Sequence, residues 1–200
     1  MKRFAVHSAG ILAVATMTAS CLPFYQTAYY HPEAASGIVT TGARCGGPPN
    51  RIELAAGRVR VSQIAWKTAH GMAIGMTIIV PPGNTVSLLE RHVELTVPGG
   101  AERYHAPFEA VTLVVNRYPQ PTQSIERPLV GDADPRDVLT RAGDRIRGTV
   151  YSLTTELLLP EADVMESKLP RFSVDGRMVE LPKITLSRRT HTGFFEPINC

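Results

Sequence analysis

The chain has 200 residues, of which 21 are Lys or Arg and 18 are Asp or Glu, so its formal net charge at pH 7 is +3. The sequence has no run of Lys and Arg and no basic stretch interleaved with aromatic residues, so we expect no binding to nucleic acid. The length is sufficient for one domain of ordinary size.

The first 20 residues have the pattern of a secretory signal peptide. Lys2 and Arg3 are basic, residues 4–17 are mostly apolar, and small residues precede Cys21. The apolar run is shorter than the roughly 20 residues of a membrane-spanning helix, so we expect residues 1–20 to be removed. A helix that stays in the membrane is the alternative. Subtracting the two cations Lys2 and Arg3 from the net charge of +3 leaves +1.

The string T-A-S-C that ends at Cys21 resembles the lipobox of bacterial lipoproteins. This resemblance implies that the Cys21 thiol carries a diacylglycerol and that the mature protein starts at Cys21. Thr18 stands where the family usually has Leu, so ordinary signal cleavage nearby is the alternative. Leu22 follows the cysteine instead of the Asp that often keeps lipoproteins at the inner membrane. The resemblance therefore favours the outer membrane, with the domain facing the periplasm.

Residues 21–44 are predicted to be the lipidated cysteine and a tether, because they contain scattered Pro and Gly and no sustained period. Residues 45–200 are predicted to form a single domain. Two cysteines remain, and an oxidising compartment favours a disulfide between Cys45 and Cys200. The alternative is that one of these two cysteines is free or pairs with another chain. The aromatic residues in the tether are expected to lie at the membrane interface or to pack on the domain; they are Tyr25, Tyr29 and Tyr30.

From Gly57 onward the sequence has the pattern of β-strands. Residues 58–61 alternate polar and apolar, and residues 72–80 have an apolar residue at every second position. A period of two is typical of strands. After the turn at residues 81–84, the alternation loses its phase between Leu88 and Val93. This step predicts a bulge or a corner between two sheets.

The middle of the chain is predicted to hold a strand, a loop and the only helix of the domain. Residues 108–115 have the composition of a strand, and the proline-rich residues 116–129 are predicted to be a long loop. The helix is predicted from Asp134 to Gly143. Asp134 is suited to its N-cap and Pro135 to its first position, and Asp137 complements the helix dipole.

The last part of the chain returns to strand patterns. Residues 151–159 alternate, and residues 172–174 precede Asp175-Gly176, a strong signal for a two-residue hairpin turn. The second arm continues to Leu186, with Pro182 marking a bulge or an edge.

These elements predict an all-β, mainly antiparallel fold, either a β-sandwich or a small barrel, with one short helix. No family is identified for the folded domain. The apolar positions of the alternating segments are expected to form the core; they include Val61, Ile74, Met76, Ile78, Leu95, Leu113, Leu157 and Leu186.

No catalytic motif is present, and we expect neither a catalytic residue nor a cofactor. Asp132, Asp134 and Asp137 resemble the start of a calcium loop but lack its glycine turn and distal Glu. The histidines are scattered without metal-ligand spacing. They are His31, His70, His92, His105 and His191. Six carboxylates are candidates for a glycosidase pair, whose proximity the sequence cannot show; they are Glu53, Glu90, Glu94, Glu109, Glu156 and Glu180.

The sequence therefore favours a non-catalytic envelope lipoprotein, with a structural or assembly role. It would bind a protein partner through an exposed edge strand or through the proline-rich segment. The alternative is a periplasmic module that binds a glycan or a small apolar ligand, with Trp66 stacking on sugars. Against this alternative, Trp66 is expected to be a core residue. An enzyme with dispersed residues is the third hypothesis.

Overall fold

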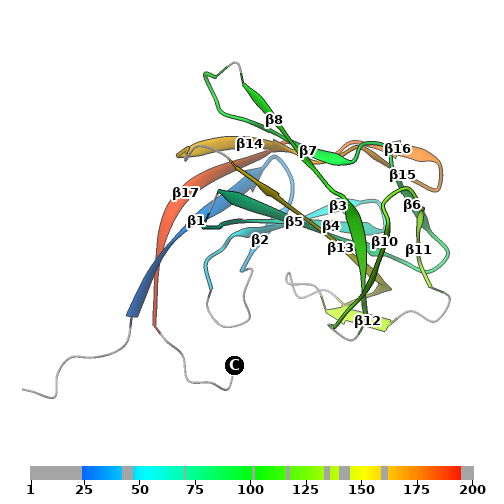
Figure 1. Cartoon of the computed structure of the whole chain (residues 1–200). Helices are drawn as coiled ribbons and strands as arrows, with labels where there is room; N and C mark the ends of the chain where they lie inside the picture. Colours follow the sequence, from blue (N-terminus) through cyan, green and yellow to red (C-terminus); the bar gives the residue numbers. More distant parts are fainter. Residues whose placement is uncertain are drawn as a thin grey trace, which may run out of the picture.

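The computed structural model describes residues 24–41, 47–69, 71–100, 102–115, 118–132, 136–139, 145–158 and 162–194. These residues form an all-β fold in which every strand pair is antiparallel, as predicted. The strands are arranged in three open sheets with a sandwich-like packing (Figure 1). Of the two predicted architectures, the sandwich is the one observed.

Sheet A has five strands, in the order β1 (Phe24–Ala34), β17 (Ile184–Phe194), β14 (Val164–Lys168), β7 (His92–Thr96) and β8 (Arg103–Pro107). Sheet B has eight strands. Seven of them follow the order β10 (Tyr118–Ser124), β9 (Ala110–Val115), β13 (Arg145–Leu157), β5 (Met72–Val80), β4 (Val59–Lys67), β3 (Arg51–Ala56) and β2 (Ile38–Thr40), and β12 (Arg136–Leu139) pairs with β13. Sheet C has four strands, β11 (Leu129–Val130), β6 (Thr85–Leu88), β15 (Phe172–Val174) and β16 (Arg177–Val179).

The core contains the apolar faces of all three sheets, with β5 in the middle of sheet B. The prediction of the core was confirmed. Six of the predicted residues are at most 1% exposed, namely Val61, Ile74, Met76, Ile78, Leu95 and Leu186. The other two, Leu113 and Leu157, are partly buried and pack against the core.

Sheets A and C are two ends of one bent layer. Glu94 pairs with Lys168 in sheet A, and Leu88 pairs with Phe172 in sheet C. Between these pairs the Leu89 N–H donates to the Arg171 carbonyl at 2.9 Å. The segment from Leu88 to Glu94 is six residue steps long, and it lies opposite the segment from Lys168 to Phe172, which is four steps long. The two extra residues bend the strands. The corner predicted between Leu88 and Val93 is therefore confirmed.

The hairpin predicted at Asp175-Gly176 is also confirmed. Asp175 and Gly176 have φ angles of 50° and 78°, as a two-residue turn of type I′ requires. The Asp175 carboxylate accepts hydrogen bonds from the Thr85 N–H at 2.8 Å and from Asn84 Nδ2 at 2.6 Å. The turn is thereby fixed to the start of β6.

The predicted helix was wrong. Arg136–Leu139 is strand β12, paired with Arg145–Gly148 at the start of β13, and the described residues contain no helix. The rest of the segment from Asp134 to Gly143 lies outside the described residues. The cap and dipole signals are weak local preferences, and pairing with a neighbouring strand outweighs them.

Two further segments predicted to be irregular are edge strands. The tether of residues 21–44 contains β1 and β2, and the proline-rich loop of residues 116–129 contains β10 and the first residue of β11. Proline disrupts a strand between two partners, because it cannot donate to the ladder, but an outermost strand tolerates it. Pro32 in β1 and Pro119 in β10 both lie in outermost strands.

One buried polar contact connects the two main sheets. Gln63 on β4 and Ser167 on β14 are 1% and 0% exposed. Gln63 Nε2 donates to Ser167 Oγ at 2.9 Å, and Ser167 Oγ donates to Gln63 Oε1 at 3.2 Å. A buried amide without partners is costly, so this contact favours one alignment of sheet A over sheet B.

Replacing Ser167 by Ala tests this contact. The variant leaves the Gln63 amide unpaired in the core, so we expect the free energy of unfolding to fall by about 1–3 kcal/mol in urea denaturation. Ser173→Ala, on the outer side of sheet C, is the control and should change it by less than about 0.5 kcal/mol. Equal stability of the two variants would contradict the role given to the contact.

Candidate functional site

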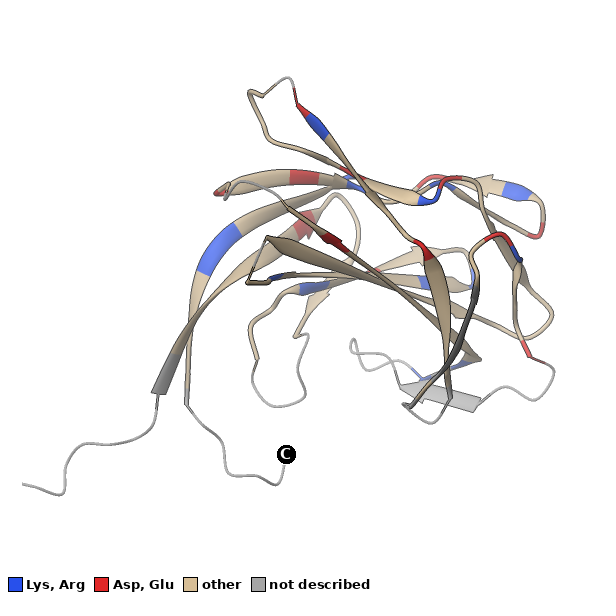
Figure 2. Ribbon diagram, in the orientation of Figure 1, with Lys and Arg blue, Asp and Glu red and all other residues tan. Residues whose placement is uncertain are grey.

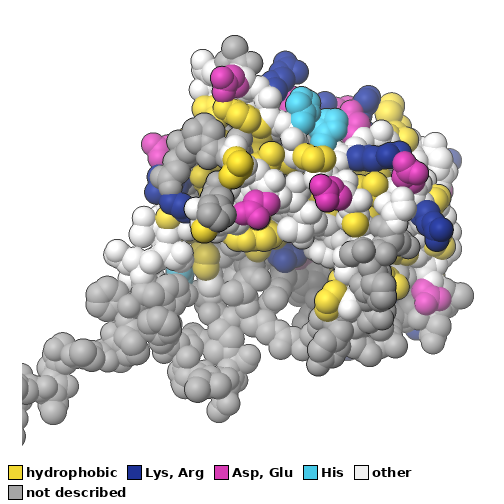
Figure 3. All heavy atoms as spheres, in the orientation of Figure 1, with side chains coloured by type: hydrophobic (Ala, Val, Ile, Leu, Met, Phe, Trp, Pro, Cys, Tyr) yellow, Lys and Arg dark blue, Asp and Glu magenta, His cyan; other side chains and the backbone are white. Residues whose placement is uncertain are grey.

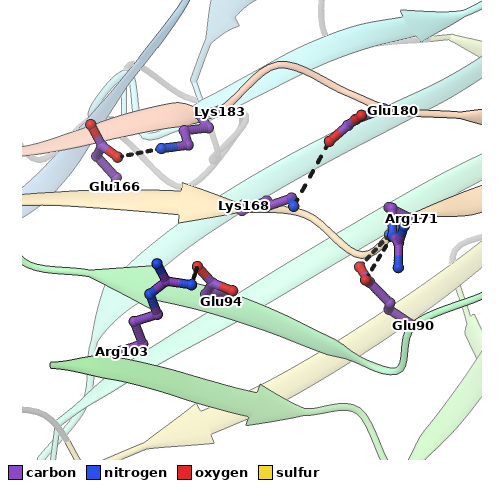
Figure 4. A network of polar contacts seen from close by, with 8 residues as sticks. All are labelled: Glu90, Glu94, Arg103, Glu166, Lys168, Arg171, Glu180 and Lys183. Atoms are coloured by element: carbon purple, nitrogen blue, oxygen red, sulfur yellow. Dashed lines mark hydrogen bonds and ion pairs between the residues drawn. The ribbon is translucent and has the colours of Figure 1, made fainter.

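Four ion pairs form a network over β7, β8, β14 and the segments that join sheets A and C (Figure 4). The N···O distances are 2.7 Å for Glu90–Arg171, 3.0 Å for Glu166–Lys183, 3.7 Å for Glu94–Arg103 and 3.8 Å for Lys168–Glu180. Three of the six candidate glycosidase carboxylates therefore face a cation. For Glu90, the backbone N–H and guanidinium of Arg171 lower the pKa, which opposes the proton uptake that a general acid needs.

Glu90 has a structural role in this network. Its carboxylate accepts hydrogen bonds from the backbone N–H of Arg171 at 3.0 Å and from the Arg171 guanidinium at 2.7 Å. The backbone hydrogen bond is the largest cause that lowers the pKa of Glu90, and the guanidinium adds to it against the effect of burial. The pair joins the two chain segments that cross between sheets A and C.

Glu53 and Glu156 are too far apart to form a catalytic pair. Glu53 lies on β3 and Glu156 on β13, with β4 and β5 between them. At a spacing of about 4.8 Å per strand, their backbones are roughly 14 Å apart or more. Glycosidase carboxylates are separated by about 5–10 Å. Glu109 is exposed between β8 and β9, on neither strand.

Two histidines that are far apart in the sequence are in contact on the β7–β8 hairpin. His105 lies opposite Glu94, and the His92 and His105 ring centroids are 4.7 Å apart at an interplanar angle of 71°. Histidine side chains are visible together on this face (Figure 3). In the sequence, the turn residues Pro98, Gly99 and Gly100 between the two strands are the signal that could have indicated this proximity. Within the described ranges, no three His, Cys, Asp or Glu side chains are placed to hold a metal ion.

Trp66 is not the core residue that we expected. It is half-buried on the outer face of sheet B, opposite Ala73 in the register. Its ring packs over Gly75, where a Cβ atom would lie 3.1 Å from the ring. Trp66 follows Ala65, which is fully buried, so the alternation of β4 turns the ring outward. An aromatic face of this kind can stack on a sugar ring.

The most unusual feature of the fold is the free end of the β1–β17 pair, which we call the terminal ribbon. It consists of residues 24–28 paired with residues 190–194. The pairing of β17 with β14 ends at Ser187, followed by one hydrogen bond from Arg188 N to Asp163 O at 2.7 Å. Beyond that point, neither strand is paired with a further strand among the described residues, and the ribbon extends away from the sheets (Figure 1). Its exposed residues include Gln26, Ala28, Thr190 and Thr192.

The root of this ribbon is firmly attached to the domain. Tyr29 and Tyr30 are buried, so they pack on the domain, which was one of the two alternatives considered for them. His31 Nδ1 lies 3.1 Å from the Pro49 carbonyl oxygen, and the rings of Tyr29 and His31 meet edge to face at 6.2 Å. Across the ladder, Arg189 forms an ion pair with Glu33 at 2.6 Å. The ribbon therefore has a fixed base and a projecting end.

The signal peptide, Cys21, Cys45, Cys200, His70 and Asp134 lie outside the described residues. Lipidation of Cys21 and the disulfide between Cys45 and Cys200 stay predictions. Among the described residues, no helix is long and apolar enough to span a membrane. Comparison with known proteins finds no matching family model, no matching curated protein and no matching solved structure.

The Glu90 contact predicts a pH dependence of stability. A carboxyl whose pKa is lowered by folding stabilises the fold above its ordinary value of 4.5, and this contribution is lost as the pH falls through the lowered pKa. Glu90→Gln should therefore have a lower urea midpoint than the native chain at pH 7, and the gap should close below pH 4.5. Glu180→Gln is the control, since its exposed ion pair at 3.8 Å should contribute little. A gap for Glu90→Gln that stays constant with pH would rule out the charge as its cause.

Proposed function

We propose that this chain is a non-catalytic, lipid-anchored protein of the bacterial envelope that binds a protein partner, with the terminal ribbon as its docking surface. The observation that carries the proposal is the ribbon itself, two paired strands with no further partner strand in the described residues. Each outer edge presents backbone N–H and C=O groups that an added strand can pair with. A two-stranded ribbon is only marginally stable by itself. Pairing with a third strand therefore stabilises the ribbon more than it would stabilise the edge of a larger sheet.

The other sheet edges in the described residues are less suited to adding a strand. Edge strand β10 contains Pro119 and Pro121 and has a register shift between Pro119 and Thr122. Proline and bulges are the devices that keep an edge from pairing. Strand β11 has two residues, β2 and β16 have three each, β12 has four, and β8 has five and ends at Pro107. β1 has 11 residues and one proline.

A binding role rather than a catalytic one is supported by the carboxylates. Glu90, Glu94 and Glu180 each face a cation, and Glu53 and Glu156 are separated by two strands. The lipid anchor is supported by the signal pattern and by the T-A-S-C string. The same resemblance favours the outer membrane and a domain in the periplasm.

A second candidate function is glycan binding on the outer face of sheet B. It is favoured by the half-buried ring of Trp66 over Gly75. Hydroxyl groups lie on the same face, since Thr77 pairs with Ser152. Trp66 is the only tryptophan of the chain, so this face has fewer large stacking surfaces than a dedicated sugar site would use.

The lipid anchor is tested by Cys21→Ser. The thiol is the attachment atom, and each buried methylene of the acyl chains contributes about 0.8 kcal/mol to membrane binding. We therefore expect the variant to leave the membrane fraction, and mass spectrometry of the native chain to find acyl groups on Cys21. Cys200→Ser should stay with the membrane. An unmodified Cys21, or a mature N-terminus elsewhere, would refute the anchor.

The docking surface is tested by photocrosslinking in cells. A photoreactive amino acid at Thr192, exposed on the ribbon, should capture one discrete envelope protein. The same amino acid at Thr154, exposed on sheet B opposite Gly75, should not capture it. No capture at Thr192, together with saturable glycan binding that Trp66→Ala removes, would replace the proposal with the second candidate.

A further inference from the structure

The distance between the predicted lipid anchor and the folded domain is set by covalent geometry. Strand β1 begins at Phe24, so only Leu22 and Pro23 separate it from Cys21. A fully extended chain spans at most about 3.6 Å per residue, so the Cα atoms of Cys21 and Phe24 are within roughly 11 Å of each other. A tether of more than 20 residues would have allowed the domain to move freely above the membrane. The strand leaves no such tether.

We propose that the terminal ribbon stands with its free end on the lipid headgroups and holds the domain in a fixed orientation on the membrane. This inference rests on the lipidation of Cys21 in the proposed function and adds the membrane surface as a second contact. Phe24 pairs with Phe194 at the free end, so both strands of the ribbon reach the headgroups together.

The terminal ribbon carries no acidic residue that anionic lipid would repel. Residues 24–30 and the whole of β17 contain no Asp or Glu, whereas β17 contains Arg188 and Arg189. Figure 2 shows basic but no acidic residues along β17. Both arginines lie at the root of the ribbon, opposite Tyr30 and Tyr29. The first acid along β1 is Glu33, which is paired with Arg189.

The residue types at the free end are those of a membrane interface. The backbone positions at the tip belong to Phe24, Tyr25, Gly193 and Phe194. Aromatic residues are enriched at headgroup level in membrane proteins. The next residues inward, such as Gln26 and Thr192, are exposed, polar and uncharged.

The orientation limits the partner. The ribbon lies at one end of the molecule and sheet C at the other (Figure 1). With the ribbon on the membrane, the hairpin of β15 and β16 points away from it. A strand that adds to the ribbon edge must then come from a protein segment close to the same membrane. The partner is therefore an envelope protein with an extended segment next to the bilayer.

The test uses the full, lipidated chain in vesicles of phosphatidylethanolamine and phosphatidylglycerol that contain headgroup-spin-labelled lipid as a quencher. A fluorescent amino acid is incorporated at Thr192 on the ribbon or at Met178 on β16, which is 68% exposed. We expect strong quenching at Thr192 and little at Met178. A variant with a spacer of about 20 Gly and Ser residues between Pro23 and Phe24 should lose most of the quenching, because such a spacer reaches roughly 25 Å.

The outcomes separate the two proposals. A chain that carries lipid at Cys21 but shows equal quenching at Thr192 and Met178 overturns the orientation and leaves the anchor intact. A spacer variant quenched as strongly as the native chain overturns the argument from covalent reach. A chain that carries no lipid at Cys21 overturns both the anchor and the orientation.

Discussion

The pairing of β1 with β17 is the constraint on which the rest of the structure depends. It runs over all 11 residues, from Phe24–Phe194 to Ala34–Ile184. On the inner side, Tyr30 and Pro32 lie buried beside the fully buried Leu186 and Ile184, so the pairing completes the cover of sheet A over sheet B. On the free side, the same ladder continues past the domain and becomes the terminal ribbon. One pairing thus supplies both the closure of the core and the surface that we propose as functional.

The two strands of this pair are the first and the last strands of the described chain, so the fold depends on both of its ends. Bringing β1 and β17 together closes almost the entire chain, although the entropic cost of closure grows only slowly with length. The Gln63–Ser167 contact aligns sheet A through β14, the other neighbour of β17. The Glu90–Arg171 contact fixes the corner between sheets A and C. The first contact thereby helps to position β17, which pairs with β14 on one side and with β1 on the other.

The sequence predicted those parts of the fold whose signals are local. The alternation of residues 72–80, the Asp175-Gly176 turn and the corner after Leu88 each follow from a few neighbouring residues. The errors concern edges and pairings. The prolines of β1 and β10 suggested loops because the sequence does not show which strands are outermost. The exposure of Trp66 and the contact between His92 and His105 depend on strand phase and register. Arg136–Leu139 forms a strand because it pairs with β13, and local helix signals carry no information about that pairing. The ribbon, which is the candidate site, depends on a pairing between the two ends of the described chain and has no local signal.

Hydrogen–deuterium exchange of the mature protein, followed by mass spectrometry, tests the central claim most directly. The account predicts slow exchange in residues 29–34 and 184–188, where both strands belong to the sandwich, and faster exchange in residues 26–28 and 190–193, where they pair only with each other. Membrane attachment or partner binding should slow the second group selectively. Exchange of residues 24–34 throughout at the rate of an unfolded chain would show that this segment is a tether and would contradict the account.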